Sequence, residues 1–455
     1  METALEKPYS VGTLHYTLGG VLAVCGWMLW GGFCYSMLAY VLVPTLLPLT
    51  LDSFHASGAL IGLVVGSIPA AMNFVMNPIL STTSDRTRTK WGRRIPYLAF
   101  ATPFVALFLI LLGWTPEAAA LLHATVLPGV SPATLGIVLV CAFAVFFQFF
   151  NLIIGSIYYY IFADVIPHRF IGRFMAFLNL SFTAAGFVFN YFLMEYAREY
   201  SSWIYTGIGI LYAVSFALMC FFVKEGEYPP PPQYQAATVP VAKRLVNWMG
   251  IYFRQCYRSP FYSMLFLGTA MTQVSTVCRS VFNLLFATRE LHLTEAQFGR
   301  IMGIGSLVSL GVILLMGYLM DKLHPLRVFL WSGVLVILIN VWGYFHVTDY
   351  ATFFAVGIVI VIVYSVQTLS CVPMYIALFP PEKYGQFSSA NAMVNSVLVI
   401  VANWGGGLAI DRFGYRFIFV WDFIFTVIAT AVLIYVYVKW KQLGGMNHYK
   451  APEVE

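Results

Sequence analysis

Charge is the first thing that this sequence lacks. Asp, Glu, Lys and Arg together make up 10% of its 455 residues, while hydrophobic residues make up 60%. Soluble globular domains carry about 25% charged residues, so the composition excludes an ordinary soluble protein and predicts one that crosses a membrane several times. The formal net charge is +6, but the cations are spread over short polar segments rather than gathered on one face, which argues against nucleic-acid binding.

The sequence also lacks the motifs of common catalytic and metal sites. Its eight histidines are scattered, no group of residues has metal-ligand spacing, and there is no nucleophile motif or Gly-rich phosphate-binding loop. We therefore expect no enzyme activity, no cofactor, no bound metal and no direct use of ATP. The seven cysteines all fall in apolar segments or on the predicted inner side, so we expect no disulfides.

Long apolar runs dominate what is present. A helix needs about 20 apolar residues to span a hydrocarbon core roughly 30 Å thick, and this criterion predicts an all-α membrane protein with twelve transmembrane helices. The predicted helices cover 17–46, 58–82, 96–114, 134–164, 174–196, 203–223, 260–288, 298–320, 327–346, 351–378, 388–410 and 417–439.

One long polar stretch divides the predicted helices into two groups of six. We expect an N-terminal six-helix bundle (1–223), a cytoplasmic linker (224–259) and a C-terminal six-helix bundle (260–455). The linker closes with a segment whose apolar residues recur at helical spacing among basic residues, so it is predicted to lie along the membrane surface. Two similar six-helix halves are typical of secondary transporters.

Lys and Arg are distributed unevenly between the two predicted sides. Nineteen lie on one side, together with both termini, and five lie on the other. Basic residues resist translocation, so we expect both termini to be cytoplasmic, in a plasma membrane or bacterial inner membrane. Residues 407–416 carry an Asp-Arg, Gly and Arg signature resembling the inner loops, yet this count places them outside. A missed or extra span would move them inside.

The densest cluster of charge follows the second predicted helix. Residues 84–97 read Ser-Asp-Arg-Thr-Arg-Thr-Lys-Trp-Gly-Arg-Arg-Ile-Pro-Tyr. A carboxylate at a helix C-terminus is unfavourable unless nearby cations compensate its charge, and this loop supplies such cations. We therefore expect the loop to act as a latch that closes the inner side of the protein. The predicted latch residues are Asp85, Arg86, Gly92, Arg93 and Arg94, with Asp321, Lys322 and Arg327 as the repeat after the eighth helix.

On these residues the chain resembles the major facilitator transporters. Residues 84–97 are most similar to the loop between helices 2 and 3 of the glycoside–pentoside–hexuronide:cation symporters and the related sucrose–proton symporters. The resemblance implies two six-helix pseudo-repeats and transport of a sugar or glycoside by alternating access. It also implies cation coupling, with proton symport expected first and facilitated diffusion next, and a central cavity lined by helices 1, 4, 7 and 10.

Polar residues inside those four helices are the expected substrate contacts. In the seventh helix the polar side chains fall within about 160° of arc, opposite an apolar face. Such a stripe lines a cavity or joins neighbouring helices by hydrogen bonds, and amides beside aromatic rings suit a sugar because amides answer hydroxyls as donor and acceptor. The predicted substrate residues are Trp27, Trp30, Gln148, Asn151, Tyr159, Gln273, Thr276, Arg279, Asn283, Tyr364, Gln367 and Tyr375.

The chain departs from the resembling family where the coupling cation would bind. The melibiose-permease type has two carboxylates one helical turn apart, whereas this chain has Asn73 and Asn77. A neutral amide can coordinate a sodium ion weakly through its oxygen but cannot carry a proton, so these two are weak candidates for cation coupling, as is Asp422 in the twelfth helix. Arg279 is predicted either to pair with Asp422 or to bind an acidic sugar. The sucrose–proton symporters also carry an arginine in the fourth helix, and this chain has no arginine at the matching place, near Tyr159.

Other functions stay open at this point. An exporter or facilitator of another amphipathic solute, such as a nucleoside or muropeptide, fits the same composition, and so does a membrane sensor of the same fold that transports nothing. The expected partners are a small solute, membrane lipid and a proton or sodium ion, with no nucleic acid, and we expect a monomer. Uptake by the purified protein would separate these alternatives.

Overall fold

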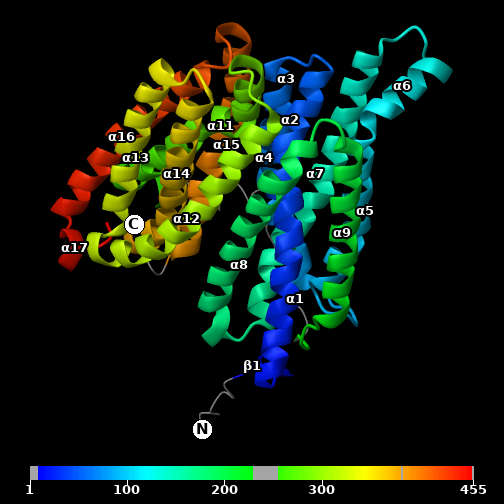
Figure 1. Cartoon of the computed structure of the whole chain (residues 1–455). Helices are drawn as coiled ribbons and strands as arrows, with labels where there is room; N and C mark the ends of the chain where they lie inside the picture. Colours follow the sequence, from blue (N-terminus) through cyan, green and yellow to red (C-terminus); the bar gives the residue numbers. More distant parts are fainter. Residues whose placement is uncertain (1–8, 229–254, 381–382, 453–455) are drawn as a thin grey trace, which may run out of the picture. The chain divides into compact units, whose positions relative to one another are not determined.

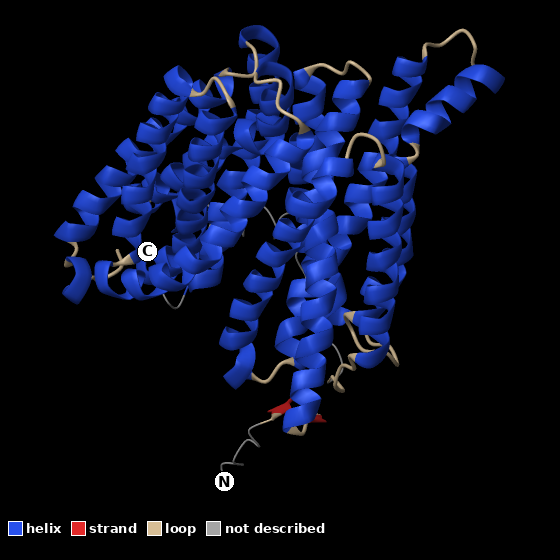
Figure 2. Ribbon diagram, viewed as in Figure 1, coloured by secondary structure: helices blue, strands red, loops and turns tan. Residues whose placement is uncertain are grey.

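The computed structural model describes residues 9–228, 255–380 and 383–452. Helix accounts for most of this part of the chain, and a single short hairpin supplies the strands (Figure 2). Apolar runs of this length fold as helices because every backbone polar group must find its hydrogen bond within the membrane.

Long helical segments occupy all twelve predicted positions in the described residues (Figure 1). In the first half they are α1 (Leu18–Ser36), η1 (Met37–Leu42) and α2 (Val43–Ser53) as one rod; α3 (Gly58–Gly62), η2 (Leu63–Ser67) and α4 (Ile68–Arg86) as a second; α5 (Ile95–Gly113); α7 (Pro132–Val165); α8 (His168–Val188) with η3 (Phe189–Leu193) and η4 (Met194–Tyr196); and α9 (Ser201–Phe222). In the second half they are α11 (Pro260–Leu285) with η5 (Phe286–Glu290), α12 (Glu295–Leu323), α13 (Pro325–His346), α14 (Tyr350–Leu378), α15 (Tyr384–Phe413) and α16 (Phe417–Gln442).

Ten of these segments are long and apolar enough to cross a membrane. The segments that begin with α11 and α12 are outside those ten. For α11 the reason is its polar stripe, which lowers the average hydropathy of an otherwise membrane-length helix. The predicted amphipathic part of the linker lies almost entirely in 229–254, outside the described residues.

Three short elements were not predicted. The hairpin of β1 (Ser10–Val11) and β2 (Leu14–His15) precedes α1. Helix α6 (Thr115–Thr125) lies between α5 and α7 as a separate short rod (Figure 1), and α17 (Gly445–His448) follows α16. All three are too short to produce a membrane-length apolar run, which was the signal used to predict helices.

The described chain divides into two compact units. The first is drawn from the described residues of 1–56, 71–233 and 298–303, and the second from those of 57–70, 234–297 and 304–455. Residues 57–70, at the start of the second helical segment, therefore group with the second unit, and residues 298–303, near the start of α12, group with the first. Because 229–254 lie outside the described residues, the predicted bundle boundaries at 223 and 260 stay predictions.

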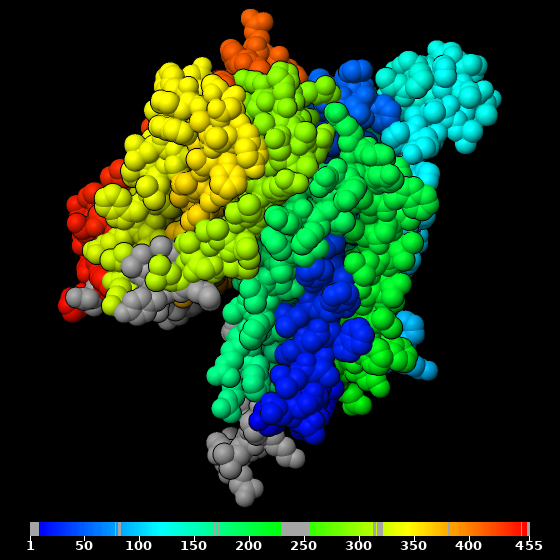
Figure 3. Space-filling view, viewed as in Figure 1, coloured from blue at the N-terminus to red at the C-terminus, as the bar shows by residue number. Residues whose placement is uncertain are grey.

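Each unit has its own packed interior. In the first, α5 packs against α7 and α9, and α1 lies against α8 and α9. In the space-filling view the blue surface of α1 has green surfaces on both sides (Figure 3). In the second, α11 packs against α15 and α16, and α13 against α14 and α16. Aromatic rings fill the second interior, where Tyr262, Phe266 and Phe387 are fully buried. Burying such side chains stabilises each unit by shape complementarity, since lipid is as apolar as the protein interior.

Within the second unit, the start of α3 lies against the end of α15. Both oxygens of Asp411 accept backbone N–H groups at the first turn of α3, from Gly58 at 2.6 Å and from Ala59 at 2.9 Å. A β-carbon on Gly407 would lie 2.1 Å from the carbonyl oxygen of Gly58, so the contact requires glycine. Arg416, at the other end of the 407–416 signature, binds Glu290 at 3.0 Å. Residues 407–416 thus cap the start of α3 through Asp411 and form an ion pair with the end of η5 through Arg416.

Candidate functional site

The loop after α4 folds back on itself as a tight hairpin. The backbone groups of Thr89 and Gly92 bond each other in both directions, at 3.1 and 3.3 Å. Gly92 has φ +107°, a conformation that residues with a β-carbon rarely adopt, and a β-carbon there would lie 2.5 Å from the Glu225 side chain. Glycine at position 92 therefore allows the chain to turn, so that Arg93 and Arg94 both reach the carboxylates described below.

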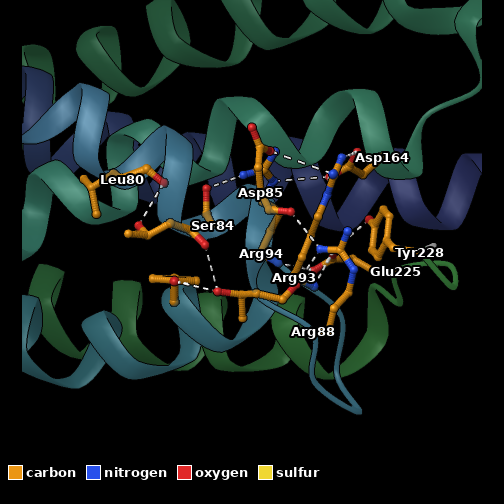
Figure 4. A network of polar contacts seen from close by, with 12 residues as sticks. Leu80, Ser84, Asp85, Arg88, Arg93, Arg94, Asp164, Glu225 and Tyr228 are labelled. Carbon is orange, nitrogen blue, oxygen red and sulfur yellow. Dashed lines mark hydrogen bonds and ion pairs between the residues drawn. The ribbon is translucent and has the colours of Figure 1, made fainter. Parts of the chain in front are cut away.

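Asp164, in the last turn of α7, lies between the two arginines that follow the hairpin (Figure 4). Arg93 donates to it through Nε at 3.0 Å and Nη2 at 2.5 Å, and Arg94 donates through Nε at 3.3 Å. The hydrogen bond to Asp164 raises the pKa of Arg93 above its ordinary value, with a smaller lowering by burial. Asp164 was placed at a helix end in the sequence, but its role as the shared acceptor was not predicted.

Asp85 completes the loop cluster from the end of α4. Arg94 Nη2 lies 2.5 Å from Asp85 Oδ1, whereas Arg93 Nη1 lies 3.8 Å from the same atom. Arg94 also donates to Ser84 through Nη1. The predicted latch residues Asp85, Gly92, Arg93 and Arg94 therefore come together, while Arg86 is exposed at the last residue of α4.

Glu225, three residues past the end of α9, was missed by the sequence reasoning. Its carboxylate accepts the backbone N–H groups of Arg93 at 3.0 Å, Arg94 at 2.8 Å and Ile95 at 2.7 Å. It thereby caps the N-terminus of α5, where a negative charge is favourable. Tyr228 donates to the same carboxylate at 2.8 Å and stacks its ring under the Arg93 guanidinium at 4.2 Å. Burial raises the pKa of Tyr228, so its hydroxyl stays a donor.

The predicted repeat of this latch in the second half is only partly described. The Asp321 side chain lies outside the described residues, and Lys322 is exposed. Arg327 lies over the Trp440 ring at 5.7 Å, with His324 beside the same ring at 4.5 Å. A second latch at these residues stays a prediction.

A second charged cluster is buried inside the second unit. Arg279 on α11 donates through Nε to Asp422 Oδ2 on α16 at 3.3 Å, and the two side chains are 5% and 0% exposed. Arg279 also lies over the Phe419 ring at 4.9 Å. Of the two alternatives for Arg279, the structure has the pairing with Asp422. The guanidinium is buried among these partners within its own unit, and its binding of an acidic sugar stays a prediction.

Two further side chains complete this buried cluster. Asn340 on α13 accepts from Arg279 Nη2 at 2.6 Å and donates to Asp422 Oδ2 at 2.9 Å. Tyr364 on α14 donates its hydroxyl to Asp422 Oδ2, and Thr426 donates to the other oxygen at 3.2 Å. Tyr364 was predicted as a substrate contact, but its hydroxyl is engaged here. Asn340 was not predicted, although a single amide inside an apolar span was a signal that it has a partner.

The two amides at the expected cation position bond each other. Asn77 donates to Asn73, one turn earlier on α4, and Ser156 on α7 donates to the Asn77 oxygen at 2.5 Å. These contacts make a small neutral cluster in the first unit. Without a carboxylate, its oxygens offer a cation only weak coordination.

The remaining predicted substrate residues divide by what they contact. Trp30 donates its indole N–H to Ser215 at 3.0 Å, and Trp27 stacks on Phe222 at 4.8 Å. Gln148 accepts from Asn151 at 3.3 Å, and Thr276 donates to the backbone of the exposed Gln273 at 2.9 Å. The Tyr375 ring stacks on Phe379 at 5.3 Å. Gln367 is buried, whereas Tyr159 is 38% exposed.

Three buried amide oxygens accept no hydrogen bond within the described residues. They are Oδ1 of Asn151 on α7, Oδ1 of Asn283 on α11 and Oδ1 of Asn395 on α15. The first two lie on faces predicted to contact substrate. Buried polar atoms nearly always have a partner, so each of these oxygens is free to accept a hydrogen bond from water or from a solute.

Comparison with known proteins decides the family. The family described as MFS/sugar transport protein matches residues 28–435. The chain belongs to this family. It is an all-α integral membrane protein of the major facilitator type, and the match runs from within α1 to within α16, so it reaches all twelve helical segments.

One curated relative shows partial similarity to this chain. It is 29% identical over 194 residues to the human "Membrane-associated transporter protein", a match that covers 42% of this chain and 33% of that protein. The matched region thus spans about a third of that relative's length.

Three of the solved structures with a similar fold are described as transporters. A bacterial homologue of the human lysosomal transporter Spinster superposes with a TM-score of 0.67 at 13% identity, over 97% of this chain and all of that one. The nucleoside transporter NupG gives 0.62 at 15% identity, over 93% of this chain and 100% of that one. The peptide transporter POT with sulfate gives 0.65 at 13% identity, over 96% and 97%. At such identities the likeness shows the fold alone.

Proposed function

We propose that this chain is a secondary active transporter of a sugar or glycoside that works by alternating access and is coupled to protons. Membership of the MFS/sugar transport family supports transport. The observation that supports the substrate class is that two of the three unmet amide oxygens, Asn151 Oδ1 and Asn283 Oδ1, lie on helix faces predicted to contact substrate. Sugar hydroxyls donate hydrogen bonds, and amide oxygens on polar helix faces accept them without attracting an ion.

The proposal is tested by uptake into proteoliposomes that contain the purified full chain. Labelled mono- and disaccharides and hexuronides are offered under an imposed proton gradient, a sodium gradient or neither, with nucleosides included because NupG shares the fold. Accumulation of a sugar driven only by protons supports the proposal. Equilibration without accumulation shows facilitated diffusion, and nucleoside uptake without sugar uptake replaces the substrate class.

The amide oxygens give the residue-level test. Asn151→Leu and Asn283→Leu keep side-chain size but remove the acceptor, and each is expected to raise KM for the transported sugar about tenfold, the equivalent of one lost hydrogen bond. Asn190→Leu on η3 is the matched control, because the Asn190 amide is satisfied by its own helical segment through the Gly186 carbonyl at 2.9 Å. An unchanged KM in both variants would remove these amides from the substrate site.

The loop cluster has its own part in this proposal. Asp85, Asp164 and Glu225 hold Arg93 and Arg94 at the ends of α4, α5 and α7. Charges that meet at several helix ends are suited to a latch, since small helix movements break their contacts without disturbing the apolar packing. We place this latch on the cytoplasmic side, with both termini, as the distribution of Lys and Arg predicts.

A further inference from the structure

Three buried side chains from three helices form a closed ring in the second unit. Arg279 bonds both Asp422 and Asn340, and Asn340 bonds Asp422, at 3.3, 2.6 and 2.9 Å. None of the three is more than 5% exposed. Polar residues within a membrane span are expensive and mark functional sites by default, and this ring holds one full charge of each sign.

The contacts around the Asp422 carboxylate are uneven. Oδ2 accepts from Arg279, Asn340 and Tyr364, whereas Oδ1 accepts from Thr426, one turn along its own helix. In the described part of the second unit, the charged and titratable groups that face the carboxylate are Arg279 and Cys278 on α11 and Tyr364 on α14, while α13 offers the neutral Asn340. No histidine takes part in these contacts.

Only one of these groups changes charge under ordinary conditions. Arginine keeps its proton in proteins, and an amide group stays neutral at every ordinary pH. Tyrosine and cysteine ordinarily lose theirs only in alkaline solution. Protonation of Asp422 is therefore the single step that alters the net charge of the ring, from zero to plus one.

We infer that Asp422 is the proton-binding carboxylate of this chain and that Asn340 is a positioning residue, which holds Arg279 through its amide oxygen while the carboxylate is protonated. This deepens the proposed function, on which it rests. One proton from the solution on one side of the membrane adds to a carboxylate oxygen of Asp422 to give the neutral acid, and the same proton leaves to the solution on the other side. Asn340 suits this role because its oxygen accepts from Arg279 whatever the state of Asp422.

The ring explains why the pair is retained in an apolar setting. Well-packed apolar residues often replace a buried ion pair without loss of stability, so stability alone does not account for it. A protonated Asp422 leaves Arg279 with a buried, uncompensated charge, which is unfavourable. Proton binding thus weakens the arrangement of α11, α13 and α16 seen here and favours another, which is what coupling requires.

The test that needs no substrate is an infrared titration of the purified full chain. The C=O stretch of a protonated carboxylic acid is followed as the pH falls, and Asp422→Asn is expected to lack one such band. Tyr364→Phe and Asn340→Leu each remove a donor that favours the ionised carboxylate. In these two variants the C=O band of protonated Asp422 should therefore appear at a pH about one unit higher than in the unaltered chain. Tyr435→Phe, an exposed tyrosine of the same α16, is the matched control and should leave the band in place.

Transport gives the second arm. With the sugar that the unaltered chain takes up, Asp422→Asn should lose proton-driven accumulation yet keep exchange of labelled for unlabelled sugar across the vesicle. The inference is overturned if Asp422→Asn still accumulates sugar, or if neither Tyr364→Phe nor Asn340→Leu moves the band. If Asp422→Asn does not fold, the Tyr364→Phe shift decides alone. If the unaltered chain takes up no sugar, the proposed function fails while the infrared arm still tests Asp422.

Discussion

The loop cluster and the buried ring use the same chemistry in opposite settings. In the loop cluster, two arginines share three carboxylates at helix ends, and exposure differs widely among its side chains, from 7% at Arg94 to 53% at Asp85. In the ring, one arginine faces one carboxylate inside the helices, and neither is more than 5% exposed. The first has a second carboxylate and nearby solvent for each arginine, whereas the ring has neutral partners alone besides its single pair of charges. A partner lost from the ring leaves a buried charge, while a partner lost from the loop cluster is partly replaced.

The largest expected effect is that of Arg279→Gln. It leaves Asp422 without its cation, and breaking a buried pair by removing one partner costs about 3 to 5 kcal/mol. We expect a marked fall in the thermal unfolding temperature of the detergent-purified protein and loss of uptake. The double variant Arg279→Gln with Asp422→Asn should recover much of the stability, since no buried charge is left. If Arg279→Gln folds and transports normally, the ring has neither a structural nor a functional role.

Asp164→Asn should have the next largest effect. It removes the acceptor that Arg93 and Arg94 share, and a hydrogen bond to a charged group is worth about 2 kcal/mol. Because Asp85 and Glu225 still hold both arginines, we expect the protein to fold and reach the membrane with reduced uptake. Surface expression and initial uptake rate, measured together, check this. A loss of stability equal to that of Arg279→Gln would contradict the contrast between the two clusters.

Gly92→Ala tests the hairpin that brings the arginines to Asp164. A β-carbon at φ +107° would also meet the Glu225 side chain at 2.5 Å, and a strained backbone of this kind costs about 2 kcal/mol. The control is Gly129→Ala, in the loop before α7, where an added β-carbon has no neighbour within 4 Å. Thermal unfolding of the two variants side by side is the measurement. Equal unfolding temperatures would mean that the loop readily adopts another conformation.

Asp85→Asn should have the smallest effect on stability and a clear one on transport. Its side chain is 53% exposed, and exposed ion pairs contribute at most about 1 kcal/mol. The same energy in a two-state equilibrium changes populations roughly fivefold, so we expect uptake to fall about that much while surface expression is kept. Raising the salt concentration should reduce the difference from the unaltered chain. Unchanged uptake at low salt would remove Asp85 from the latch.

Hydrophobic runs predicted the helices because their signal is local and repeated. Every predicted span coincides with a helical segment in the described residues, within a few residues at most ends. The first one continues to Ser53 rather than ending at 46, because polar residues in its last turns lowered the apolar signal there. The short α6 and the hairpin before α1 carry no such run and were missed.

Partners across the fold were harder to predict. Arg279 and Asp422 were recognised as a candidate pair because charges are rare in spans. Asn340 was not, because the sequence does not say which face of α13 meets α11 and α16. Glu225 was read as part of a polar linker, although it lies 2.7 Å from the backbone of Ile95 at the start of α5. Both residues act through contacts with groups more than 50 positions away.

Composition and periodicity by themselves determined the class of this protein, its twelve helical segments and the loop that carries its densest charge, since burying apolar surface and satisfying backbone groups are requirements that each segment meets alone. Only the tertiary structure decided which charges neutralise one another. Asp411 caps α3 rather than joining a basic loop, and Asp164 and Glu225 rather than Asp85 hold most of the contacts to Arg93. Electrostatic partners depend on distances of a few ångströms between helices far apart in the chain, and no local pattern specifies those distances.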